Sequence, residues 1–422
     1  MKKIFIFYSL MILLLPDMSG LKAQPEITLS RLISIGLERN PEIQMHKNQT
    51  EMIELTIPQQ GSWPDPVLSF GVMNLPTDSY RFDAEPMTQK TVELMQTVPF
   101  FGKPSIREEI AEKEHQSRLF VLSNTRLSLV NEIVQAYYDL YYLEKWSEII
   151  GQNKSLMNDF IQIADTKYRT GQGIHQDVLK SQLEMMQLEK MIIDLTEQAE
   201  NRRTKIYALL DYPDGIVLRN LPVPLDPKLA MPLDSLQKMA IQNNPVLSGA
   251  MTGIEKSKLA AQLARREYWP DFSVVFSYGE RVNHPDFISG MVSVNLPIFA
   301  ASKQARKVQE ETIATHAAQN EYRTLKNNIT LQVKLFYDRL QRDRKLFDLY
   351  RNEILPQARQ ALESAIGAYR ADKVDFSTLL ANQVTLINHE IEFNRILTSY
   401  HQNLSNLALV CGTSLDDEAN WF

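Results

Sequence analysis

Two fifteen-residue stretches of the chain resemble each other at a separation of 201 residues. Residues 168–182 read YRTGQGIHQDVLKSQ, and residues 369–383 read YRADKVDFSTLLANQ. The Tyr-Arg pair, one leucine and one glutamine keep the same spacing in both stretches. Each stretch begins at the end of a long segment with helical periodicity and contains the residues of a short turn. The chain is therefore predicted to consist of two similar halves, each with a long helical hairpin that turns here.

Other sequence pairs occur in the same order in both halves. They are Asn40-Pro41 with Asn244-Pro245, Trp63-Pro64-Asp65 with Trp269-Pro270-Asp271, and Val98-Pro99-Phe100-Phe101 with Leu296-Pro297-Ile298-Phe299. Chance can produce one such pair but not an ordered series. The first repeat is predicted at 24–212 and the second at 233–411, with a proline-rich link at 213–232 and a tail at 412–422.

Each half contains two segments in which apolar and polar residues alternate, the pattern of strands with one apolar face. They form predicted β-hairpins at about 66–98 and about 271–297. The apolar faces carry Leu68, Phe70, Val92, Phe276 and Val292. Strands of roughly 8 to 10 residues are close to the roughly 9 to 11 that a tilted strand needs to cross a bilayer. A soluble β-sandwich is the alternative, but no further strand-rich segment supplies a second sheet.

The segments after the hairpins have apolar residues at spacings of three and four, which indicates very long helices. Residues 103–168 contain no proline beyond Pro104, and about 65 residues of helix would extend almost 100 Å. The second copy contains Pro356, which should kink or locally break it. The predicted helical hairpins span about 103–210 and about 302–410. Helices of this length must pack against each other or against copies of the chain.

The composition indicates an ordered, exported protein. The 422 residues are 44% hydrophobic and 23% charged with a net charge of −6, which argues against a basic nucleic-acid-binding protein. Lys2 and Lys3 precede an apolar run at 4–15, and Ala23 offers a cleavage point, so residues 1–23 are predicted to be a signal peptide. The single Cys411 lies near the far end, so no lipid anchor on a cysteine after the cleavage point is expected.

No motif of enzymatic chemistry is present in the sequence. It contains no HExxH, GxSxG, P-loop or CxxC spacing, and its seven histidines are scattered. Met185, Met186 and Met191 fit either helix packing or a soft site for a monovalent copper-type ion. We expect no catalytic activity, cofactor or resident metal.

The ordered motifs in both halves resemble the TolC outer-membrane efflux family, and the resemblance covers nearly all of the predicted mature chain. The resemblance implies a mainly α protein with a membrane β part. Three protomers would each lend four strands to one shared β-barrel in outer-membrane lipid, and their helical hairpins would form a trimeric α-barrel across the periplasm. It also implies a passive duct docked to a periplasmic adaptor (membrane fusion) protein and an inner-membrane efflux pump. The predicted strands are consistent with a shared barrel, because four short strands cannot close a barrel with a lumen.

The resemblance also implies where the pore closes. The family's gate contact, a tyrosine hydroxyl bonded to an aspartate, falls on Tyr369 and Asp177. The glycine of the second turn is replaced by Asp372, while the gate arginine falls on Val374. A ring of Asp372 or Asp375 would replace a lost acidic ring and favour cations, but helix-cap or solvated-loop roles fit both equally. The predicted adaptor contacts are Tyr168, Arg169, Gly171, Arg370 and Lys373.

The exported solute and the class of protein each leave an alternative open. The stretches 63–66 and 99–103 look more like the branch that exports heavy-metal cations, whereas drugs or other small molecules are the alternative cargo. A periplasmic coiled-coil adaptor or scaffold would share the long helices but not the alternating strands. An exported enzyme would require a reactive cluster that forms only in three dimensions.

Overall fold

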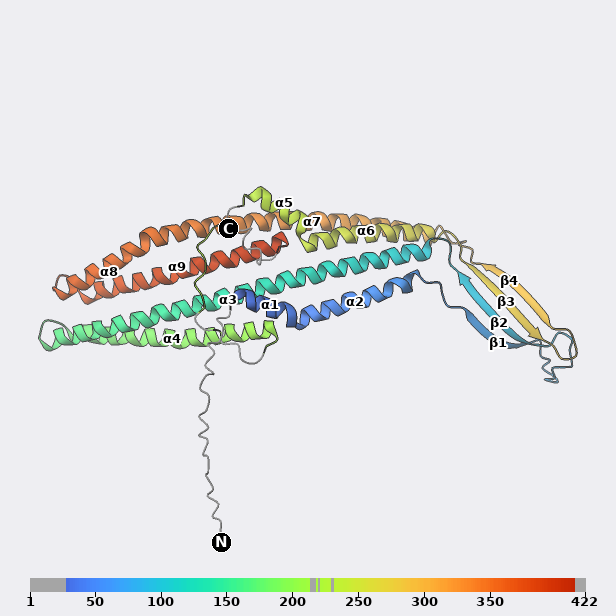
Figure 1. Ribbon diagram of the computed structural model, residues 1–422, viewed down its shortest axis with the longest axis horizontal. Helices are drawn as coiled ribbons and strands as arrows, with labels where there is room; N and C mark the ends of the chain where they lie inside the picture. The colour runs from blue at the N-terminus through green and yellow to red at the C-terminus, as the bar shows by residue number, and fades with distance from the viewer. Residues whose placement is uncertain (1–27, 213–217, 219–220, 229–230, 414–422) are drawn as a thin grey trace, which may run out of the picture.

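The computed structural model describes residues 28–212, 218, 221–228 and 231–413. The predicted signal peptide and most of the predicted tail lie outside the described residues. Figure 1 shows a long molecule in which extended helices run side by side, with a sheet at one end and the turns of two helical hairpins at the other. The two ends are therefore available for different functions.

The two halves contain the same order of elements. The first half consists of α1 Leu29–Arg39, α2 Pro41–Gly61, β1 Val67–Met73, β2 Gln89–Val98, α3 Lys103–Arg169 and α4 His175–Leu210. The second consists of α5 Leu233–Asn243, α6 Pro245–Arg266, β3 Phe272–Glu280, β4 Phe287–Val294, α7 Gln304–Leu349, a π-helical segment η1 Tyr350–Ile354, α8 Leu355–Arg370 and α9 Phe376–Cys411. The predicted hairpins and long helices are present within a few residues of their expected bounds.

Each half begins with two helices that meet at an Asn-Pro pair. Asn40 leaves the helical conformation, and its side-chain oxygen accepts a hydrogen bond from the backbone N–H of Glu42 at 2.9 Å. Asn244 caps α6 in the same way through the N–H of Leu247 at 3.1 Å. A proline follows each asparagine in the first turn, where its missing N–H costs no helical hydrogen bond. The Asn-Pro pairs therefore end one helix and begin the next.

The strands form one antiparallel sheet in the order β1-β2-β3-β4. Its central pairing joins the two halves, with Leu94 opposite Phe276. The edge strands expose large apolar side chains to solvent, including Phe70, which is 74% exposed, and Val292, which is 67% exposed. An apolar face this exposed on a single chain indicates that it contacts lipid or other protein.

The helical core is centred on α3, a helix of 67 residues. Its Ile133, Leu140 and Ile150 are fully buried against neighbouring helices. Pro356 lies in the first turn of α8, immediately after the π-helical segment, so the predicted interruption is confirmed. Among the described helices, none is long and apolar enough to cross a membrane.

Candidate functional site

The candidate site is the pair of turns at the end of the molecule opposite the sheet, which we call the tips (Figure 1). The first tip joins α3 to α4, and the second joins α8 to α9. Gly171 and Asp372 stand 201 residues apart, and both have positive φ, at 74° and 55°. Aspartate adopts this conformation more readily than most residues other than glycine. Asp372 thus takes the backbone role of glycine while adding a negative charge.

Tyr168 and Tyr369 occupy equivalent positions but have different surroundings. The Tyr168 ring lies 5.0 Å from that of His175, and the Tyr369 ring lies 5.5 Å from that of Phe376. Tyr168 is 45% exposed, whereas Tyr369 is 4% exposed. Burial, together with the negative charges of two nearby carboxylates, raises the pKa of Tyr369 to about 12. Its hydroxyl therefore remains a hydrogen-bond donor at physiological pH.

Lys167 connects the two tips. Its ammonium donates to the backbone carbonyl of Tyr369 at 2.7 Å and lies 4.5 Å from the centre of the tyrosine ring. It also forms an ion pair with Asp372. The sequence repeat gives no signal for Lys167, because its counterpart 201 residues later is Ala368. The contacts of Lys167 depend on the fold, which brings the two tips together.

Asp177 lies in the first turn of α4, beside the second tip. Its pKa is raised mainly by burial, with a further contribution from the charge of Asp375, while Lys180 and Lys167 act in the opposite direction. The charge of Asp177 in turn contributes to the raised pKa of Tyr369. Within the described part of a single chain, no hydrogen bond joins them.

The remaining predicted residues at the tips differ in the contacts that their side chains make. Asp375 caps α9 by accepting from the N–H of Thr378 at 2.7 Å. Hydrogen bonding from the Thr378 side chain, and then from this N–H, lowers the pKa of Asp375. The helix-cap alternative is therefore realised for Asp375. Arg169 lies 3.7 Å from Asp165 in an exposed ion pair. Arg370 and Lys373 are exposed and form no ion pair with any residue that the structure describes.

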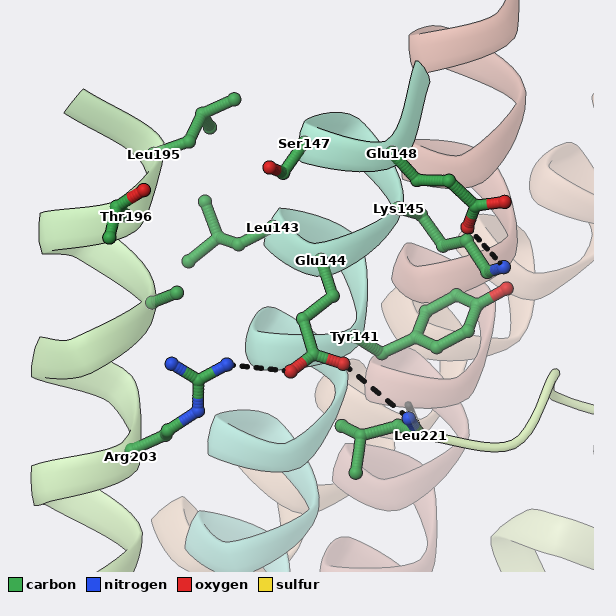
Figure 2. Close-up of a pocket in the computed structure, with 11 residues that line it drawn as sticks. Tyr141, Leu143, Glu144, Lys145, Ser147, Glu148, Leu195, Thr196, Arg203 and Leu221 are labelled. Carbon is green, nitrogen blue, oxygen red and sulfur yellow. Dashed lines mark hydrogen bonds and ion pairs between the residues drawn. The ribbon is translucent and has the colours of Figure 1, made fainter. Parts of the chain in front are cut away.

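The polar residues that line a cavity about halfway along the helices form hydrogen bonds that hold neighbouring segments together (Figure 2). Arg203 donates to Glu144 at 2.7 Å, and its Nε donates to the carbonyl of Leu218 at 2.9 Å. The other Glu144 oxygen accepts from the N–H of Leu221 at 3.4 Å. These hydrogen bonds attach Leu218 and Leu221, in the segment between the two halves, to helices α3 and α4. Across the described residues, no group of three or more His, Cys, Asp or Glu side chains is arranged to hold a metal ion.

The geometry so far defines an elongated helical protein with an amphipathic sheet at one end and charged tips at the other. Residues 32–211 match the family described as outer membrane efflux protein. By this match over its first half and by its likeness in fold to solved outer-membrane channels, the chain is similar to TolC-like outer-membrane efflux channel proteins.

Among its relatives is the cobalt-zinc-cadmium resistance protein CzcC of Cupriavidus metallidurans, which is 19% identical over 403 residues covering 93% of this chain and 91% of CzcC. The outer membrane protein VceC of Vibrio cholerae has a similar fold, with a TM-score of 0.76, 15% identity and coverage of 92% of this chain and 96% of VceC. CusC has a TM-score of 0.73, 12% identity and coverage of 92% and 93%.

Proposed function

We propose that three copies of the chain form one continuous duct across the outer membrane and the periplasm. The observation that carries the proposal is the four-stranded sheet, whose edges are open and whose apolar face is exposed. About eight strands are needed before a barrel interior is even filled by side chains, so one chain cannot enclose a channel. Three four-stranded sheets would supply twelve strands.

The proposed duct continues through the helical hairpins. Three copies of α3 with α4, and of the α7 to α8 segment with α9, would surround a periplasmic tunnel. The matching order of elements in both halves supports an internal duplication at 24–212 and 233–411, because alternating halves would give the tunnel a nearly regular wall. Export by a signal peptide at 1–23 belongs to the same proposal.

The tips would close the tunnel and contact other proteins. The influence of the Asp177 charge on the pKa of Tyr369 supports a gate in which the phenol donates to the carboxylate, a charge-assisted bond stronger than a neutral one. Asp372 and Asp375 would add negative charge around the opening. The exposed group at the tips, Tyr168, Arg169, Gly171, Arg370 and Lys373, would contact a periplasmic adaptor that leads to an inner-membrane pump.

The proposed cargo is a heavy-metal cation that passes through without chemical change. The relationship to CzcC supports this assignment, and the net charge of −6 suits a duct for cations. The pump would supply the energy, so the channel needs no catalytic residue. A strain without this gene should become sensitive to cobalt, zinc, cadmium, copper or silver while its tolerance of common antibiotics is unchanged. Sensitivity to antibiotics alone would instead assign the channel to small-molecule efflux.

The membrane placement of the sheet has a direct test with matched variants. Phe276 lies on the apolar face, and the adjacent Ser277 points to the opposite face of the same strand. Phe276→Arg should cost about 2 to 4 kcal/mol if this face meets lipid near the midplane. Ser277→Arg should assemble nearly normally. Equal recovery of both variants in the outer membrane would contradict the placement.

A further inference from the structure

The proposed trimer leaves one junction that a single chain does not contain, where β4 of one copy meets β1 of the next. We propose that this junction repeats the β2–β3 junction, with Ser293 opposite Ser69 and Val292 opposite Phe70 of the neighbouring copy. The inference rests on the proposed trimer and adds the register and the residues of its contact.

The β2–β3 junction ends in a compact cluster that joins the two halves. Asp271 accepts from the Lys103 ammonium at 2.8 Å and from the backbone N–H of Phe100 at 2.7 Å. The same ammonium donates to the carbonyl of Trp269 at 2.9 Å, and the Phe100 ring stacks on the Trp269 ring at 5.2 Å. Lys103 is buried although it is charged. A buried lysine with two oxygen partners marks this cluster as a specific junction.

The two motifs of this cluster each occur a second time in the chain. These second copies lie at the two edges of the sheet, where neither has the other as a neighbour. Trp63-Pro64-Asp65 precedes β1, and Pro297-Ile298-Phe299 follows β4. Trp63 is 55% exposed and Phe299 is 71% exposed. Asp65 and Lys303 are also exposed, and neither forms an ion pair within the part of the chain that the structure describes. The sheet order puts the two motifs at opposite edges, so a second copy is needed to join them.

The register follows from the junction that is present. In β2–β3, Met95 lies opposite Val275 and Leu94 lies opposite Phe276. Pro99 and Pro297 are 198 residues apart. At the same spacing, Ser293 is equivalent to Met95 and Val292 is equivalent to Leu94. Trp63 and Trp269 are 206 residues apart. At the same spacing, Ser69 is equivalent to Val275 and Phe70 is equivalent to Phe276. The two serines thus meet on one face and the two apolar residues meet on the other.

This register agrees with the chemistry of the faces. A shift by one residue would place Ser69 opposite Val292 and mix the polar and apolar faces, which strongly disfavours it. A shift by two residues would keep the faces. It would displace Asp65 along the neighbour by about 6 to 7 Å, and the motif cluster could not form.

In the proposed register Asp65 lies against the turn that precedes α7 of the neighbour, and Lys303 supplies the cation. The turn between Pro297 and Gln304 is three residues longer than the turn between Pro99 and Lys103. Lys303 therefore stands just before α7, whereas Lys103 begins α3. Its long flexible side chain can accommodate this difference.

The register is tested by cysteine pairs in the full chain, expressed in outer membranes and treated with a mild oxidant. Directly opposed Cβ atoms are about 4.5 to 5.5 Å apart and diagonal ones about 7 to 8 Å, so only opposed cysteines approach disulfide distance, about 3.5 to 4.5 Å. Ser69→Cys with Ser293→Cys should give a covalent product of three chains that reductant releases. The slipped pairs, Ser69→Cys with Met291→Cys or Asn295→Cys, should give mainly single chains. The natural Cys411 is buried and should not interfere.

An amine cross-linker applied to the unaltered chain reports the trimer separately. A trimer in which a slipped pair cross-links better than the proposed pair would overturn the register and leave the proposed function standing. Absence of a trimer would overturn both.

A charge exchange tests the cluster itself. Asp65→Lys and Lys303→Asp should each make the trimer dissociate at a lower temperature, and the double exchange should restore most of the loss. If the double variant is no better than the single variants, the pairing of Asp65 with Lys303 is wrong.

Discussion

The side-chain amide of Asn244 donates to the carbonyl oxygen of Val410 at 2.9 Å, and thereby ties the start of α6 to the end of α9. Asn40 makes the same bond to the carbonyl of Leu209, also at 2.9 Å. The two acceptors stand 201 residues apart, as the tips do. Each asparagine thus caps one helix and satisfies a carbonyl at the free end of another.

Replacing Asn244 by alanine should lower the free energy of unfolding by about 2 to 3 kcal/mol, because the cap contributes about 1 kcal/mol and a buried carbonyl loses its donor. Asn48→Ala is the matched control, since Asn48 is exposed on α2. The thermal midpoint of the detergent-extracted protein reports the difference. Equal midpoints for the two variants would show that the asparagine bridge contributes little.

Removing either partner of the proposed gate should open the channel. Tyr369→Phe keeps the buried ring and deletes only the hydroxyl, while Asp177→Ala deletes the acceptor. Both should raise single-channel conductance in planar bilayers. Tyr168→Phe makes the same chemical change at the exposed equivalent position and should leave conductance unchanged. Parental conductance in both gate variants would contradict the contact between Tyr369 and Asp177.

Neutralising the acidic groups at the second tip should weaken the preference for cations. Asp372→Asn removes a charge from a residue in the left-handed conformation, which asparagine also tolerates. Asp375→Asn keeps the ability to cap α9. The reversal potential of the double variant in a salt gradient should move toward zero. An unchanged reversal potential would assign these residues to structure alone.

The pH dependence of stability should include His401. Burial lowers the pKa of His401, whose ring bonds the carbonyl of Leu225 at 2.9 Å and stacks on Tyr138. Above the unfolded pKa of about 6.5 the group is neutral in both states and adds no pH dependence. Below it the unfolded chain binds the proton more readily, so stability falls as pH falls, by up to about 1.4 kcal/mol per pH unit.

His401→Gln should therefore flatten the loss of stability that occurs as the pH falls below about 6.5. The exposed His316→Gln should leave the slope as it was. Denaturant unfolding at several pH values measures both slopes. A steeper slope for the His401 variant than for the parent would refute the assignment.

Much of the fold could be predicted because its elements are long and strongly periodic. A period of two over β2 and β3, and spacings of three and four along α3, are repeated often enough to exclude the alternative structure. Pro356 marked the one interruption of the second long helix because proline lacks the N–H that the helix needs. The Asn-Pro pairs repeat in the sequence, but the repeat alone does not reveal that each pair ends one helix and begins the next.

The contacts at the two ends could not be predicted in the same way. Lys167 meets Tyr369 across two hairpins, and Lys103 meets Asp271 across the two halves. Neither pair has a sequence spacing with physical meaning. Both depend on packing that brings distant segments together.

The proposed function requires the chain to work as a membrane-embedded trimer. The most direct measurement is the native mass of the full-length protein after extraction from outer membranes with detergent. We expect a complex of three chains, with little protein in the aqueous fraction. A single chain that is recovered from the aqueous fraction without detergent would contradict it.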